Sequence, residues 1–181
     1  MKKIEVELEG ISPLLVNRFL DKQISEKAKK HSAESMDSPV SEKLYLLNNK
    51  PYLPARYFEA SLIEAGKQFK IAGKNRATYS KYLGATIRID PEAILLAPNK
   101  YEVYSIAGVN PMTKGRIMIH RPRFEKWGCK FVIVCEEDNI EVDTVQRILE
   151  FAGRFVGVGD WRPDKKGRFG KYRIVQFKEV N

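Results

Sequence analysis

Two stretches with apolar residues at helical spacing, each flanked by strand-like alternation, most constrain the fold of this chain. The first spans about residues 55–68 and the second about residues 143–155, where Asp143 and Gln146 have the spacing of an N-terminal helix cap. The apolar stripes are Phe58, Leu62, Ala65 and Phe69 in the first stretch, and Val145, Ile148, Leu149, Ala152, Phe155 and Val156 in the second. Both patterns predict amphipathic helices, each with one buried face.

Strand-like stretches surround these two helices. Ile4, Val6 and Leu8 alternate with charged residues before Gly10. An extended apolar segment is expected at 11–19, and a short hairpin at 44–54 with its turn at 48–50. Further strand-like stretches are 87–96, which Pro91 interrupts, 101–109, 115–123, 129–135 and 172–177. The order strand, helix, strands, helix, strand predicts an α+β fold of the ferredoxin-like or RRM-like split βαβ kind, with an antiparallel sheet.

The length of 181 residues suits a single domain over 1–181. Residues 21–42 are rich in lysine and serine and have almost nothing to bury, which predicts a flexible insertion. Residues 70–81 are basic and contain no acid, and a solvated surface helix is their simplest interpretation.

The two cysteines and the apolar runs indicate where the protein resides. Cys129 and Cys135 fall on one face of a strand, too far apart to bridge, and are expected to be core residues. Two such thiols fit a reducing compartment. Acids interrupt the basic start of the chain, and the longest apolar runs are too short to span a membrane. We therefore expect a cytoplasmic protein with no membrane partner.

A glycine-rich segment over 153–173 is the sharpest functional feature. The formal charge of +9 favours a polyanionic partner, and glycines at 157, 159, 167 and 170 would let the backbone approach phosphates. The predicted contact residues are Trp161, Arg162, Lys165, Lys166, Arg168, Phe169 and Lys171, with Tyr172 as a further aromatic for base stacking. The alternative is a tight helix-to-strand connection in which Gly157, Gly159, Gly167 and Gly170 serve turns.

A second basic run lies between 114 and 126. It contains Lys114, Arg116, His120, Arg121, Arg123 and Lys126. Arg121 and Arg123 flank Pro122, so an extended segment is expected there. The run predicts a second nucleic-acid contact, and the alternative is an edge strand whose charges prevent aggregation.

Three short motifs carry a family resemblance. Ser12-Pro13-Leu14, Pro51-Tyr52-Leu53-Pro54 and the loop from Gly157 to Gly170 together resemble the RAMP superfamily, the RNA-binding backbone and processing subunits of CRISPR effector complexes. Gly-Asp-Trp-Arg-Pro at 159–163 is also similar to an element of small uncharacterised phage proteins. The resemblance implies an RRM-like fold, single-strand binding and head-to-tail assembly with copies of itself. Ala55-Arg56 stands where backbone subunits have Gly-Ser, which leaves a phage protein with this fold as an equal alternative. A phage-encoded protein is expected in the host cytoplasm.

We predict a non-catalytic protein that binds single-stranded RNA or DNA through the two basic segments. Asp160 and Asp164 lie among cations, which opposes metal binding, so neither a metal nor a cofactor is expected. One alternative is a metal-independent endoribonuclease in which His120 acts on an RNA 2′-hydroxyl, as in processing members of the superfamily. The other is an interaction protein that inhibits a nucleic-acid-handling complex.

Overall fold

The computed structural model describes residues 1–18, 39–74, 76–110, 113–136 and 140–180. Its centre is an antiparallel sheet in the order β10–β1–β9–β5. The strands are β1 (Lys2–Gly10), β5 (Ile87–Asp90), β9 (Gly128–Cys135) and β10 (Tyr172–Val180). Because side chains alternate along β1, Ile4, Val6 and Leu8 are buried on one face while Glu5 and Glu9 point to the other.

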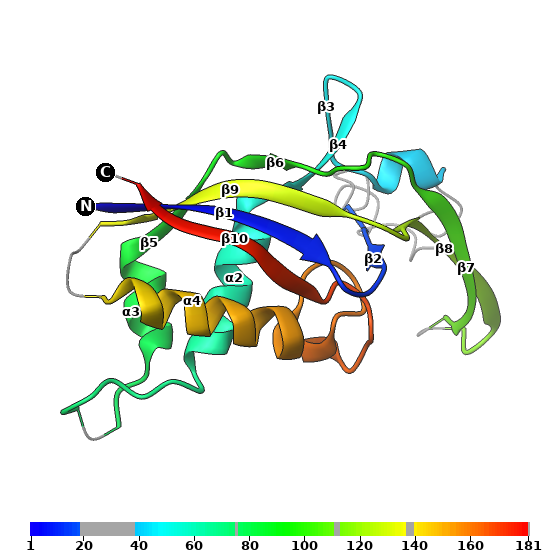
Figure 1. Ribbon diagram of the computed structural model, residues 1–181. Helices are drawn as coiled ribbons and strands as arrows, with labels where there is room; N and C mark the ends of the chain where they lie inside the picture. Colours follow the sequence, from blue (N-terminus) through cyan, green and yellow to red (C-terminus); the bar gives the residue numbers. More distant parts are fainter. Residues whose placement is uncertain (19–38, 75, 111–112, 137–139, 181) are drawn as a thin grey trace.

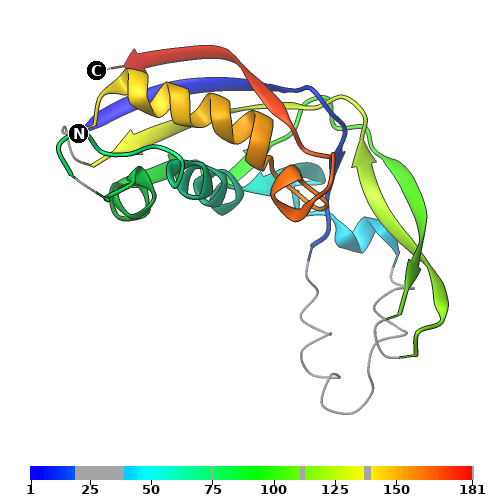
Figure 2. The same cartoon turned by 90° about the horizontal axis from the view of Figure 1, so that it is seen from below.

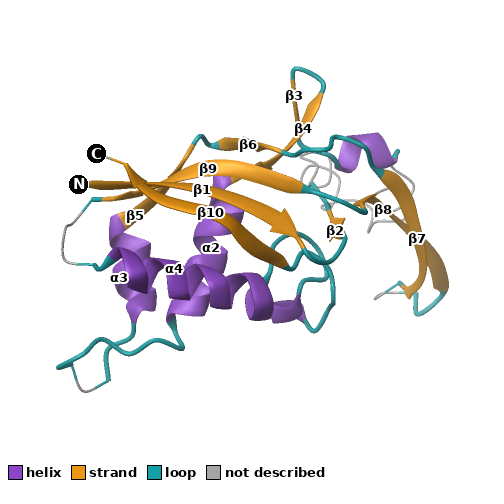
Figure 3. Cartoon of the chain, viewed as in Figure 1, coloured by secondary structure: helices purple, strands orange, loops and turns teal. Residues whose placement is uncertain are grey.

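Helices cover the buried face of this sheet, as Figures 1, 2 and 3 show. They are α2 (Ala55–Gly66), α3 (Tyr79–Thr86) and α4 (Val142–Phe151). Phe58 of α2 is fully buried and packs on Phe131 of β9 with ring centroids 4.9 Å apart. Burying such a ring contributes about 2 kcal/mol, so this contact is a centre of the core.

The order β1, α2, β5, β9, α4, β10 is the split βαβ arrangement, so the predicted fold class is confirmed. Two insertions extend it. The first, between β1 and α2, contains β2 (Leu14–Leu15), a 3-10 helix η1 (Val40–Lys43), β3 (Leu46–Leu47) and β4 (Lys50–Pro54). The second, between β5 and β9, contains β6 (Ala93–Leu95), β7 (Glu102–Val109) and β8 (Arg116–Phe124).

The insertions form two small sheets. One has the order β3–β4–β6, and Asn48 and Asn49 have the positive φ angles of a mirrored hairpin turn. The other has the order β2–β8–β7, and its β7–β8 hairpin projects from the end of the molecule opposite the two termini (Figure 1).

Several local predictions need correction. The surface helix expected at 70–81 is wrong: residues 70–74 and 76–78 are not helical, and α3 begins only at Tyr79, where its rings pack against the core. The expected cap at Asp143 is also wrong, because α4 begins at Val142 after Glu141 and has no side-chain cap. Within the extended segment expected at 11–19, the described strand is the short β2.

Residues 21–38 of the insertion predicted at 21–42 lie outside the described residues. Its last residues belong to η1, which packs on β8, so the predicted boundary falls inside an ordered element. Lys43, the last residue of η1, is buried, and its ammonium donates to the carbonyl of His120 at 3.1 Å.

Both cysteines are buried core residues, as predicted, and neither forms a disulfide. Burial raises the pKa of the Cys129 thiol and of the Cys135 thiol above the ordinary value. In the part of the chain that the structure describes, no helix is long and apolar enough to cross a membrane.

Candidate nucleic-acid interface

The glycine-rich loop is folded onto the segment that follows β1. Helix α4 continues as a π-helical turn (Ala152–Val156), and Gly157 then reverses the chain with a positive φ. The amides of Asp160 and Gly170 each donate at 2.8 Å, to the carbonyls of Leu15 and Pro13. The amide of Lys171 donates to the Ser12 hydroxyl at 3.0 Å. The Ser-Pro-Leu motif and the loop, 159 positions apart at this bond, therefore form one structural unit.

Three of the loop glycines are needed because backbone passes close to backbone. A Cβ on Gly159 would overlap the carbonyl of Leu15, one on Gly170 that of Val158, and one on Gly167 that of Trp161. The amides of Gly167 and Gly170 already donate to carbonyls within the protein. The alternative stated above, a tight helix-to-strand connection, thus accounts for these glycines. They shape the loop, and the amides of two of them are not available to bind phosphate.

The cations of the loop differ in ion pairing and in solvent exposure. Arg162 donates to Asp164 and to the Gly159 carbonyl, each at 3.2 Å, and Lys165 also pairs with Asp164 at 3.2 Å. Lys166 and Arg168 are exposed, while Lys171 is half-buried. Exposed cations neutralise phosphate at least cost, so Lys166 and Arg168 are the loop residues best placed for a polyanion.

The aromatic residues of the loop are less open than the sequence implied. Tyr172 is 1% exposed and packs beside Phe58 in the core, where burial raises the pKa of its hydroxyl. Phe169 is 7% exposed. Base stacking by Tyr172 is therefore excluded, and Phe169 offers almost no ring surface; Trp161 is half-buried and remains accessible.

The second basic run is divided between the two faces of the β7–β8 hairpin. Residues paired across the strands share a face, and neighbours along a strand alternate. Arg121 lies opposite Tyr104, and Arg123 belongs to the same face. His120 lies opposite Ser105 on the other face, with Nδ1 2.7 Å from the Ser105 hydroxyl. The separation of His120 from Arg121 could have been predicted from the sequence, because neighbouring side chains along a strand point to opposite faces.

Two further members of this run, Arg116 and Lys114, lie away from the loop. Arg116 pairs with Val109 at the end of the hairpin farthest from Arg121, and Lys114 occupies the connecting turn with a positive φ. Both are exposed. The predicted residues of this run therefore form no single cluster.

The base of the hairpin and the loop meet around Asp160. Arg121 Nε donates to Asp160 Oδ2 at 2.9 Å, although the two residues are 39 positions apart. Asp160 Oδ1 accepts the Trp161 amide at 3.1 Å and so supports the positive φ of that residue. The Tyr104 ring packs edge-on to Trp161 and Phe169, with centroids 6.3 and 5.5 Å away. We call Tyr104, Arg121, Arg123, Trp161, Lys166 and Arg168 the loop–hairpin surface.

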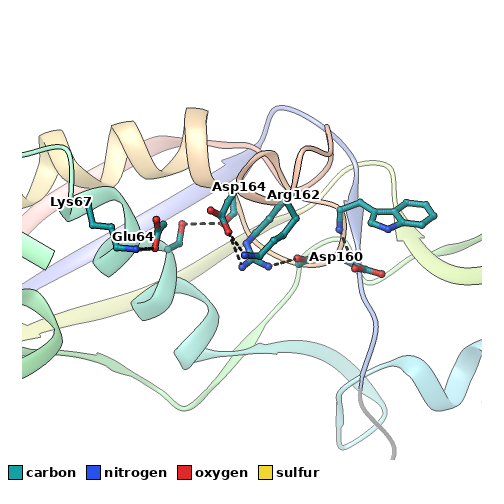
Figure 4. A network of polar contacts seen from close by, with 10 residues as sticks. Glu64, Lys67, Asp160, Arg162 and Asp164 are labelled. Atoms are coloured by element: carbon teal, nitrogen blue, oxygen red, sulfur yellow. Dashed lines mark hydrogen bonds and ion pairs between the residues drawn. The ribbon is translucent and has the colours of Figure 1, made fainter. Parts of the chain in front are cut away.

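A groove on the other side of the loop was not predicted. It has a volume of about 610 Å³ and lies between α2 and the loop. Its walls include Asn17, Arg56, Tyr57, Ser61 and Glu64 from outside the loop, and Asp160, Arg162, Asp164 and Lys165 from within it. Figure 4 shows four of these residues, Glu64, Asp160, Arg162 and Asp164. Burial and the hydrogen bond with Tyr45 raise the pKa of Tyr57. Arg56 and Glu64 fall outside the apolar stripe of the helix predicted at 55–68, and this was the only sequence signal for this wall.

The outer face of the central sheet has a different character. RNA-binding sheets of this topology carry aromatic side chains on which bases stack, whereas β1 presents Glu5, Glu7 and Glu9 there. Glu7 pairs with Lys130 at 2.8 Å and Glu9 with Arg173 at 2.6 Å. Because β1 has no aromatic side chain for base stacking, and because Lys130 and Arg173 are already paired with carboxylates, the loop–hairpin surface is the stronger candidate. Among the described residues, no cluster of three or more potential His, Cys, Asp or Glu ligands is arranged for a metal.

Comparison with known proteins finds similarity in structure and none in sequence. No protein-family model matches the sequence, and no curated protein matches it. The structure is similar to a chain of the type III-B Cmr-β structure, determined by cryo-EM with cognate target RNA bound. The TM-score is 0.63 at 12% sequence identity, and the match covers 99% of this chain and 61% of that one. The chain therefore shares its fold with that neighbour, and it spans less than two thirds of the neighbour's length.

Proposed function

We propose that this protein binds single-stranded RNA on the loop–hairpin surface and does not cleave it. The observation that carries the proposal is the junction at Asp160, where two basic segments far apart in sequence come together. The junction holds Arg121, which pairs with Asp160, and Arg123, which pairs with Glu125, beside Tyr104 and Trp161. The exposed cations Lys166 and Arg168 belong to the same loop as Trp161. Cations for the backbone next to rings for bases are the combination that single-strand binding requires.

The neighbouring loop cations extend this surface. Lys166 and Arg168 are exposed, and the Arg168 guanidinium lies 5.8 Å from the Phe169 ring centroid. The Arg123 guanidinium lies 5.6 Å from that of Tyr104. Such contacts hold long side chains in place, which reduces the entropy lost when they engage phosphate. The RAMP-like fold, shared with a chain from an RNA-bound structure, supports RNA over DNA as the partner.

Binding measurements on charge-matched variants test the proposal. We compare Lys166→Ala/Arg168→Ala with Lys50→Ala/Lys178→Ala, which removes two exposed cations outside this surface. Fluorescence anisotropy with single-stranded RNA and DNA over a range of salt gives the log–log slope. Loss of two phosphate contacts lowers its magnitude by about 1.4 in the first variant alone. Equal slopes for both double variants, or no binding by the parent protein at low salt, would refute the proposal.

The endoribonuclease alternative has one observation in its favour, the 2.7 Å contact between His120 Nδ1 and the Ser105 hydroxyl. A hydrogen-bonded imidazole is a suitable base for a 2′-hydroxyl. However, His120 faces away from Arg121 and Trp161, and so lies off the loop–hairpin surface. We expect RNA to remain intact during long incubation in EDTA. Cleavage that His120→Ala abolishes would establish the nuclease instead.

A further inference from the structure

The groove between α2 and the loop differs electrostatically from the rest of the protein. Its lining cations are Arg56, Arg162 and Lys165, and its lining anions are Glu64, Asp160 and Asp164. Three positive and three negative charges sum to zero, in a chain whose formal charge is +9. Inside the groove a phosphate gains little from Arg162, because this guanidinium already pairs with Asp164. A neutral group with polar edges is better suited to it.

The acceptors in the groove are partly engaged. Glu64 Oε2 pairs with Lys67 at 2.6 Å, and Asp164 Oδ2 pairs with Arg162 and Lys165. The second oxygens, Glu64 Oε1 and Asp164 Oδ1, accept no hydrogen bond from any described residue. Figure 4 shows Glu64, Asp164, Arg162 and Asp160 in a row from α2 to the loop. Glu64 Oε1 and Asp164 Oδ1 can therefore accept hydrogen bonds from a ligand's donors.

The rest of the lining suits a flat ring. Ala60 provides exposed apolar surface, Val156 and Val158 lie buried beneath the groove, and the Tyr57 ring is held by a 2.9 Å hydrogen bond between its hydroxyl and that of Tyr45. The volume of about 610 Å³ lies in the range of small-molecule sites. Asp160 lines this groove and also anchors Arg121 of the loop–hairpin surface, so the two sites adjoin.

We propose that this groove receives one nucleobase of the bound strand and prefers a base with an exocyclic amino group, cytosine or adenine, over uracil. This inference rests on the proposed single-strand binding and adds base preference to it. Carboxylates accept hydrogen bonds from the amino group of cytosine. The O4 of uracil is itself an acceptor, and it faces repulsion from Glu64 Oε1 and Asp164 Oδ1. Arg56 and Lys165, at the exposed rim, are placed to contact the flanking phosphates.

The test uses two oligoribonucleotides of about eight residues, one all-uridine and one with a single cytidine in the same background. One hydrogen bond of this kind corresponds to roughly fivefold tighter binding of the cytidine strand by the parent protein. Glu64→Gln removes this preference, because the amide can also donate to uracil. Glu179→Gln, on exposed β10, removes the same charge elsewhere and keeps the preference. Asp164→Asn is a second groove variant, and circular dichroism verifies that each variant is folded.

The outcomes separate the two proposals. Tight, salt-dependent binding of both strands with equal affinity overturns the base preference and leaves single-strand binding intact. A preference that Glu64→Gln and Asp164→Asn both retain also overturns the assignment to this groove. Absence of binding to either strand refutes single-strand binding itself.

Discussion

The ion pair between Arg121 and Asp160 offers the most quantitative test of the site. It joins the β7–β8 hairpin to the glycine-rich loop with an N···O distance of 2.9 Å, and its side chains are only 17% and 27% exposed. Partial burial weakens screening by water, and charge-assisted hydrogen bonds are about twice as strong as neutral ones. We expect a coupling energy of about 1.5 kcal/mol between Arg121→Ala and Asp160→Ala.

A double-mutant cycle measures this coupling. Asp160→Ala alone should cost more than Arg121→Ala alone, because Asp160 also accepts the Trp161 amide. The free energy lost with the Trp161 hydrogen bond is the same whether residue 121 is Arg or Ala, so it cancels in the cycle. Urea unfolding followed by circular dichroism gives each free energy of unfolding. With a slope of about 2 kcal/mol per molar urea, a coupling of this size displaces the midpoint by about 0.7 M.

Arg88 and Asp90 provide a control pair of the same residue types. Their N···O distance is 3.1 Å, but their side chains are 60% and 46% exposed. Solvent screening should reduce the coupling of this pair below about 0.5 kcal/mol. If the Arg121–Asp160 coupling is no larger than that of the control, the ion pair does not fix the hairpin to the loop, and the junction lacks the rigidity that we assign to it.

Three further predictions follow from the same geometry. Gly170→Ala should destabilise the protein more than Gly73→Ala in thermal unfolding. Both glycines have positive φ, but only at Gly170 would the new Cβ overlap a carbonyl, that of Val158. Equal losses of stability would contradict this. Cys129 and Cys135 should react with a thiol reagent at neutral pH only after addition of denaturant, since both are buried and their pKa values are raised; fast labelling of the native protein would contradict this. Long single strands should bind several copies cooperatively, as the family resemblance implies, and light scattering that finds one copy per strand at saturation would refute assembly.

Secondary structure and core were largely predictable because periodicity is a local property. Ile4, Val6 and Leu8 alternate as a strand buried on one side must, and Phe58 and Leu62 recur as one face of a helix must. Failures occurred where local signals were weak or ambiguous. The stretch at 70–81 contains too few apolar residues to define a period, and Tyr79 is helical because it packs against the core.

For the candidate site, sequence patterns determined which segments carry charge and glycine, and the tertiary structure decided what each residue does. Trp161 and Arg168 stood out from the sequence, but the burial of Phe169 depends on a hairpin some sixty positions earlier, through Tyr104. Likewise, Gly159 is required because the strand after Ser12 and the loop before β10 touch there, at the carbonyl of Leu15. Composition determines which charged, polar and aromatic groups a segment contains. Which charges are paired, which rings are covered and where a groove opens depend on contacts between distant segments, and these form only when the chain folds.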